Sequence, residues 1–64
     1  MNDQFYVCDA IVLRATEKAL RVDIDGEEMW IPKSHVSEES DVKEEGDEGL
    51  LVITRFIARE RGFI

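Results

Sequence analysis

The sequence predicts a small, mainly β or α+β fold, either an SH3-like β-barrel or a curled antiparallel sheet, which ends in a short helix. Three segments indicate this fold class: a β-hairpin at residues 19–32, an apolar strand at 50–54 and a capped helix at 55–61. The chain has 64 residues, and a chain of this length has room for one small core. We therefore expect a single domain over residues 1–64.

The first strand is expected at residues 5–13, which are rich in apolar and β-branched types. Only Asp9 interrupts the apolar residues, so the pattern predicts a strand that is largely covered on both faces. Cys8 lies in the middle of this strand and is the only cysteine of the chain. We expect it to be a buried, unreactive thiol, because it cannot form an internal disulfide.

The hairpin at 19–32 has the clearest local signal in the chain. Before Asp25-Gly26, a favoured hairpin turn, three apolar residues alternate with charged ones, and after it Met29 and Ile31 alternate with Glu28 and Trp30. With these two residues as the loop, Val22 faces Met29 and Leu20 faces Ile31, so the apolar side chains share one face. A shift of the register by two residues would keep the same faces together, so both registers are open at this point.

Trp30 lies on the opposite face of this hairpin, among Arg21, Asp23 and Glu28. The favoured interpretation is a second small core, in which Trp30 packs beneath the C-terminal segment with Arg21 stacked on its ring. The alternative is an exposed aromatic anchor, because tryptophan is enriched at binding hot spots. Trp30 is therefore also a candidate partner-binding residue.

After the hairpin, Pro32 should end the strand, since it cannot donate a hydrogen bond to the ladder. Residues 33–36 then predict a short helical turn. His35 has no cysteine, second histidine or carboxylate at metal-ligand spacing. We expect a surface or cap-associated histidine.

The C-terminal part predicts a strand followed by a helix with signals at both ends. Residues 50–54 form a continuous apolar run of strand length, and Thr54 is a suitable N-cap for the helix at 55–61. Gly62 suits the left-handed position after the helix, and Phe63 would close a Schellman motif hydrophobically.

Residues 37–49, which we call the acidic connector, hold nearly all of the net charge. Seven carboxylates and one lysine give this segment −6 of the −7 that the whole chain carries at pH 7. Such a charge argues against direct binding of nucleic acid, because phosphates would be repelled over most of the surface. We expect a basic protein or nucleoprotein complex as the partner, with a plain solvated loop as the alternative. The candidate partner-binding carboxylates are Glu38, Glu39, Asp41, Glu44, Glu45, Asp47 and Glu48.

The sequence shows no catalytic constellation. One histidine and one cysteine lie far apart, and the Ser-centred, phosphate-binding and zinc-protease motifs are missing. An EF-hand loop starting at Asp41 fails, because Lys43 and Val52 occupy positions that need oxygen ligands. We expect no enzyme activity, no metal site and no cofactor.

The sequence offers no signal for export or membrane insertion. Its start, Met1-Asn2-Asp3-Gln4, lacks a basic region, and no apolar run approaches the roughly 20 residues of a membrane span. We expect a cytoplasmic protein without a membrane partner, and the oligomeric state is open.

Parts of the chain between Ala19 and Phe63 resemble short uncharacterised proteins of phages and mobile elements. The resemblance rests on Trp30-Ile31-Pro32-Lys33-Ser34, on Gly46-Asp47-Glu48-Gly49-Leu50, and on Phe56-Ile57-Ala58 with Gly62. In size and acidity the chain is also similar to anti-CRISPR proteins, several families of which imitate DNA.

This resemblance implies no catalytic residues and a phage origin. It predicts a DNA-mimic inhibitor that acts in the host cytoplasm and occupies a basic nucleic-acid-binding surface of a host complex. If the acidic connector is extended from Glu38 to Glu48, it would present a ridge on the order of 33 Å long. The alternative function is a small β-barrel adaptor in a larger phage or host assembly, joined through a sheet edge or through Trp30.

Overall fold

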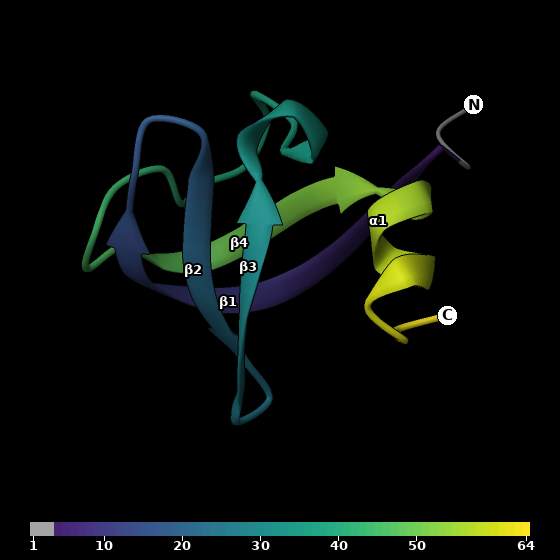
Figure 1. Cartoon of the computed structure of the whole chain (residues 1–64), viewed down its shortest axis with the longest axis horizontal. Helices are drawn as coiled ribbons and strands as arrows, with labels where there is room; N and C mark the ends of the chain where they lie inside the picture. Colours follow the sequence, from purple (N-terminus) through teal and green to yellow (C-terminus); the bar gives the residue numbers. More distant parts are fainter. Residues whose placement is uncertain (1–3) are drawn as a thin grey trace.

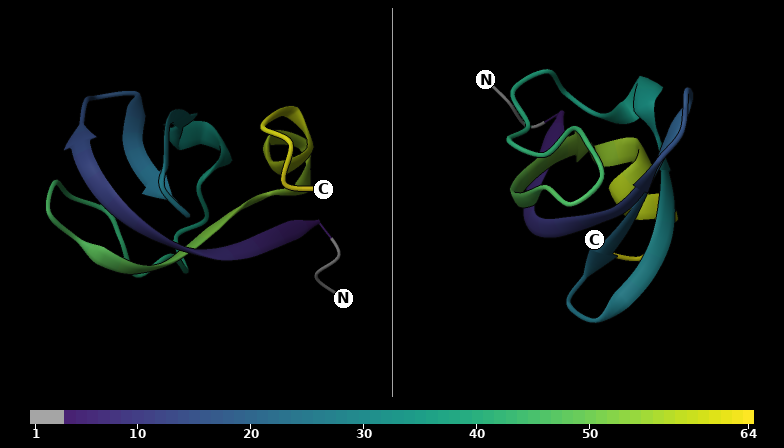
Figure 2. Two further views of the ribbon diagram at one scale, coloured as in Figure 1. Left: turned by 90° about the horizontal axis from the view of Figure 1, so that it is seen from below. Right: turned by 90° about the vertical axis from the view of Figure 1, so that its left-hand side faces the viewer.

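The computed structural model describes residues 4–64, which form one curled antiparallel sheet and a short helix. The elements in chain order are β1 (Phe5–Ala15), β2 (Ala19–Ile24), β3 (Glu27–Pro32), the 3-10 turn η1 (Lys33–His35), β4 (Glu48–Thr54) and α1 (Arg55–Glu60). The strand order is β3-β2-β1-β4, and α1 lies at the end of β4 beside β3 (Figure 1, Figure 2). The predicted fold class is therefore confirmed. Within residues 4–64, no helix is long and apolar enough to cross a membrane.

The core lies on the inner face of the curled sheet, where alternate residues of each strand point. The hairpin contributes much of it, and Ile57 and Ala58 of α1 cover one end. The fully buried large side chains are Leu20, Ile24, Ile31, Leu51, Ile53, Val12, Val22 and Val42.

The hairpin of β2 and β3 has the first of the two registers left open by the sequence. Val22 is opposite Met29, and Leu20 is opposite Ile31. Asp25 and Gly26 have φ values of 54° and 85°, as a type I′ turn requires of both central residues. This turn fixes the register and thereby places the apolar residues on the core face.

β1 is covered on only one face, so the expectation of cover on both faces is wrong. Val7 on the outer face is 55% exposed, and Ile11 and Leu13 are exposed as well. The sheet has a single layer of core beneath it, and a chain of this size supplies no second layer for the outer face. The strand also continues past the predicted end at residue 13, and an irregularity between Val12 and Arg14 brings Arg14 opposite Arg21.

The acidic connector is folded against the sheet. The Ser37 amide donates to the Val52 carbonyl, and the Asp41 amide donates to the Leu50 carbonyl, each at 2.8 Å. Its first part thereby follows the edge of β4 that β1 leaves free. The Gly46 amide donates to the Val12 carbonyl at 2.8 Å, so the connector returns to β1. β4 then begins at Glu48, two residues before the predicted start at residue 50, so Glu48 and Gly49 belong to the strand. The longest dimension of the molecule is 30 Å, and a connector that turns back within it cannot form the extended ridge.

Ser40 fastens the middle of the acidic connector to β4. Its side chain is almost fully buried, and its Oγ accepts a hydrogen bond from the Val52 amide at 2.9 Å and donates to the Val52 carbonyl at 3.1 Å. The Ser40 hydroxyl thus gives the Val52 amide and carbonyl the hydrogen bonds that a neighbouring strand would otherwise supply. Val42, two residues further on, is fully buried in the core.

Both ends of α1 have the predicted caps. Thr54 Oγ1 accepts a hydrogen bond from the Ile57 amide at 3.2 Å. At the other end, Gly62 has φ 85°, and the Phe63 amide donates to the Ala58 carbonyl at 2.9 Å, as in a Schellman motif. The helix ends at Glu60, one residue before the predicted end.

Candidate functional site

The outer face of the sheet carries a row of three side chains across β3, β2 and β1. Trp30 is opposite Arg21 in the β2–β3 ladder, and Arg21 is opposite Arg14 in the β1–β2 ladder. Residues directly opposite each other in antiparallel strands point to the same face. We call these three residues the arginine–tryptophan row.

Trp30 is exposed on this face, so its interpretation as part of a second core is wrong. Its exposed fraction is 39%, and the Arg21 guanidinium lies 5.7 Å from the centroid of its ring, which confirms the predicted stacking. The C-terminal segment that was expected to cover Trp30 packs elsewhere. Phe63 stacks on Tyr6 with ring centroids 5.6 Å apart and planes inclined by 3°.

Polar contacts hold both partners of this stack. Arg21 binds the Glu28 carboxylate through Nη2 at 2.8 Å and Nε at 3.2 Å. The Trp30 carbonyl accepts from Arg61 Nη2 at 3.0 Å and Nε at 3.2 Å, which ties the end of α1 to β3. The Arg21 guanidinium and the backbone of Trp30 are therefore held in place before any ligand arrives.

Positive charge gathers around this row. Lys18 and Lys33 flank it at one end of β2 and β3, where the Lys33 amide donates to the Lys18 carbonyl at 2.8 Å. Within residues 4–64, the ion pair Arg21–Glu28 is the only one. Arg14 and the two lysines are thus without a carboxylate at ion-pair distance in this part of the chain, so their charges are available to an anionic ligand.

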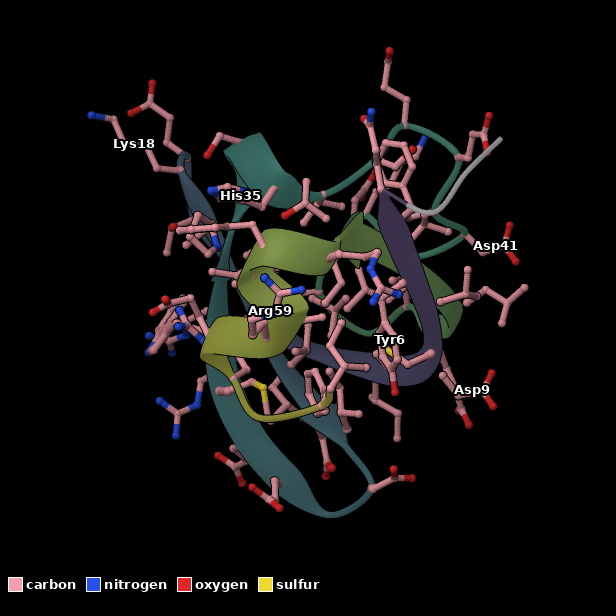
Figure 3. All side chains as sticks on the ribbon, turned by 90° about the vertical axis from the view of Figure 1, so that its right-hand side faces the viewer. Tyr6, Asp9, Lys18, His35, Asp41 and Arg59 are labelled. Carbon is pink, nitrogen blue, oxygen red and sulfur yellow. The ribbon has the colours of Figure 1, made fainter. Side chains whose placement is uncertain are left out.

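Asp9 and the first part of the acidic connector lie on a different side of the molecule from Trp30. Figure 3 shows Lys18 and His35 beside β2 and β3 with Arg59 on α1, whereas Asp9 and Asp41 lie on the side of β1 and β4. The acidic connector follows β4, so the fold does not bring Trp30 together with the predicted carboxylates as one site. The outer face of the hairpin also carries Asp23 and Glu28, so the positive charge near the row comes from Arg14 and the two lysines, and Arg21 is neutralised by Glu28.

One of the predicted partner-binding carboxylates has a structural contact. Asp47 Oδ2 accepts hydrogen bonds from the Lys43 amide at 2.9 Å and from the Glu44 amide at 2.8 Å. These two bonds stabilise the charged form and lower the pKa of the Asp47 carboxyl. Asp47 therefore closes the turn of the connector. The partner-binding role of the other carboxylates stays a prediction.

Cys8 and His35 have the environments of structural residues. The Cys8 thiol is half-buried, and burial, with a smaller contribution from Asp9 and Asp25, raises its pKa. A raised pKa lowers the thiolate fraction and so weakens the nucleophile. His35 Nδ1 lies 2.8 Å from the hydroxyl of Thr54, the N-cap of α1, so the histidine is cap-associated as expected. Residues 4–64 contain no group of three or more metal-ligand side chains.

Arg14 was not predicted to be a member of the site. Arg14 and Arg21 come together only through the irregular pairing of β1 with β2, and no local signal in the sequence predicts where a strand pair becomes irregular. The exposed position of Trp30 was weighed as an alternative, and the pairing of Trp30 with Arg21 was the one signal that could have identified the site.

The chain matches the family model described as "S1 RNA binding domain" over residues 6–64. The comparisons with curated proteins and with solved structures returned no match. The family match contradicts the resemblance to anti-CRISPR-like phage proteins, the DNA-mimic inhibitor and the exclusion of direct nucleic-acid binding, and it gives no support to the adaptor. Since the match covers nearly the whole chain, the protein belongs to the S1 RNA-binding domain family, whose fold is a small OB-type β-barrel.

Proposed function

We propose that this domain binds single-stranded RNA through the outer face of β2 and β3. The observation that carries the proposal is the arginine–tryptophan row, which places an exposed indole ring beside two arginines on a member of the S1 family. OB folds bind oligonucleotides on the face formed by their second and third strands. Trp30 and Arg21 lie on those two strands of this chain.

Trp30 is the stacking platform, and Arg14, Lys18 and Lys33, whose charges are not paired within residues 4–64, are the phosphate contacts. Stacking of a base on an aromatic side chain is worth about 1–3 kcal/mol and tolerates any base, because every base has a π face. Bases in a duplex are stacked on one another, so an exposed indole selects unpaired nucleotides. Arg21 lies over the ring and is paired with Glu28, and Arg14 lies one strand further along the row.

The net charge of −7 limits the strength of this binding but does not prevent it. Binding depends on the local potential of the contact face, and the first part of the connector lies along the edge of β4, away from β2 and β3. With about three phosphate contacts, the logarithm of affinity should fall against the logarithm of salt concentration with a slope of about −2.

The proposal includes no catalytic step, and it places the protein in the cytoplasm. The Cys8 thiol has a raised pKa, which argues against a nucleophile at that position. An unpaired cysteine agrees with a reducing compartment, where RNA is also present.

A pair of charge reversals tests this proposal. Arg14→Glu changes the net charge by the same amount as Lys43→Glu, but Lys43 lies in the acidic connector. With an oligouridylate of about ten nucleotides, a length within the range of OB-fold sites, we expect Arg14→Glu to weaken binding about tenfold and to reduce the salt slope by about one. Lys43→Glu should change the affinity less than about twofold. Equal losses in the two variants would show that net charge governs binding, and absence of RNA binding by the parent protein would refute the function itself.

A further inference from the structure

A second aromatic pair lies on the surface where α1 begins. Phe56 is 61% exposed, the largest exposed fraction among the large apolar side chains of residues 4–64. Its ring is stacked on that of His35, with centroids 5.5 Å apart and planes inclined by 22°. Full burial of a phenylalanine side chain would stabilise the fold by roughly 1.5–3 kcal/mol, and an exposed one contributes much less. An exposed Phe56 therefore suggests a role other than stability.

The local structure fixes the pair in place. α1 buries Ile57 and Ala58, and successive residues of a helix point about 100° apart, so Phe56 is turned away from the core. Thr54 links α1 to His35, because its Oγ1 accepts a hydrogen bond from the Ile57 amide and lies 2.8 Å from His35 Nδ1. The hydrogen bond to His35 can run in either direction, and it orients the imidazole ring in both cases. Because these side chains are already held in place, a ligand that stacks on them loses little binding free energy to the ordering of side chains.

The surroundings of the pair suit a nucleotide. Lys33 precedes His35 in η1, and Arg55 and Arg59 belong to α1. Figure 3 shows Arg59 and His35 on the same side of the molecule. A hollow of about 340 Å³ opens beside His35; Ser34 and Glu38 help to line it and Phe56 does not, so the hollow is separate from the proposed stacking surface.

The helix α1 connects this pair to the arginine–tryptophan row. Arg61, just beyond the helix, donates to the Trp30 carbonyl, and Phe56 lies five residues earlier in the chain. Five residues of helix rise about 7.5 Å. This rise corresponds to roughly two steps of stacked nucleotides at ~3.4 Å each. The two aromatic sites, which α1 connects, are therefore close enough to contact one short RNA strand.

We infer that the His35–Phe56 pair is a second base-stacking site, which binds a nucleotide of the same RNA strand that Trp30 binds. The inference rests on the proposed function and extends it from one aromatic contact to a path across β3 and α1. The stacking surface is the free face of Phe56, with His35 behind it. The cations of η1 and α1 supply the phosphate contacts along this part of the path.

Three substitutions at one position test the inference with an oligouridylate of about ten nucleotides. We expect Phe56→Ala to weaken binding about tenfold and Phe56→Leu to weaken it about as much, because neither side chain has a π face. Phe56→Trp should bind within about twofold of the parent, since it keeps an aromatic ring. Leu50→Ala, which truncates an exposed apolar side chain on β4, is the matched control and should leave affinity unchanged. Thermal unfolding of each variant checks that the exposed position leaves the fold intact.

The outcomes separate this inference from the function on which it rests. If Trp30→Ala weakens binding and Phe56→Ala does not, the second site is refuted while the proposed function stands. If Phe56→Leu binds as tightly as Phe56→Trp, the contact does not depend on an aromatic ring and the stacking site is likewise refuted. If the parent protein does not bind the RNA, the proposed function fails first. Because Phe56→Leu and Phe56→Trp both keep a large apolar side chain, their comparison decides the question even if Phe56→Ala is unstable.

Discussion

Replacing Trp30 by alanine is expected to weaken the binding of single-stranded RNA by about tenfold to a hundredfold. The substitution removes the stacking platform of the arginine–tryptophan row, and one stacked base is worth about 1–3 kcal/mol. It also removes the surface on which the Arg21 guanidinium lies, 5.7 Å from the ring centroid. Fluorescence anisotropy of a labelled oligouridylate measures the change. Trp30→Phe should recover most of the affinity, because it retains a smaller aromatic face.

The control for this substitution is Leu13→Ala. Leu13 is 37% exposed, nearly the same as the 39% of Trp30, but its side chain has no π face. Leu13→Ala should bind RNA as the parent does. If Trp30→Ala binds RNA as tightly as Leu13→Ala, the β2–β3 face is not the site of contact.

The second large effect concerns stability. Val22→Asp is expected to unfold the domain, because Val22 is 0% exposed and an unpaired carboxylate there would be buried in the core. Burial of an unpaired ionised group costs several kcal/mol. A domain of this size has a free energy of unfolding of only about 3–10 kcal/mol. Urea unfolding followed by circular dichroism measures the loss.

Asp23→Asn is the matched control for Val22→Asp. The Asp23 side chain points to the outer face, and its Oδ1 accepts a hydrogen bond from the Gly26 amide at 2.9 Å. An asparagine oxygen can accept the same bond, so the turn should keep its geometry and the stability should change by less than about 1 kcal/mol. Similar losses in the two variants would contradict the assignment of faces in the hairpin.

The fold was predictable where short-range rules decide the structure. The turn at Asp25-Gly26 sets the hairpin register, and the caps at Thr54 and Gly62 set the limits of α1 to within one residue. Whether β1 is buried on one face or on both could not be predicted in the same way. An apolar run fits a strand buried on one face or on both, and the choice depends on how many layers the whole chain can build.

The site was harder to predict because it depends on how charge is distributed in space. The net charge of −7 suggested that the protein would repel phosphates, but a net charge does not say on which side of the sheet each charged residue lies. Arg14 and Arg21 meet across an irregular strand pair, and the acidic connector is held along β4 by bonds such as that between Ser40 and Val52. Trp30 was judged by the usual tendency of a lone tryptophan to be buried, and the packing of Phe63 on Tyr6 instead leaves it exposed.

The most direct test of the account is a fluorescence titration of the parent protein with single-stranded RNA. Trp30 is the only tryptophan of the chain, so the emission reports on the proposed contact alone. The account predicts saturable quenching by an oligouridylate of about ten nucleotides, with an affinity that falls with salt at a slope of about −2. A duplex RNA of similar length should quench much less, because its bases are not available for stacking. RNA binding that reaches saturation without any change in Trp30 emission, or no binding at low salt, would contradict the central claim.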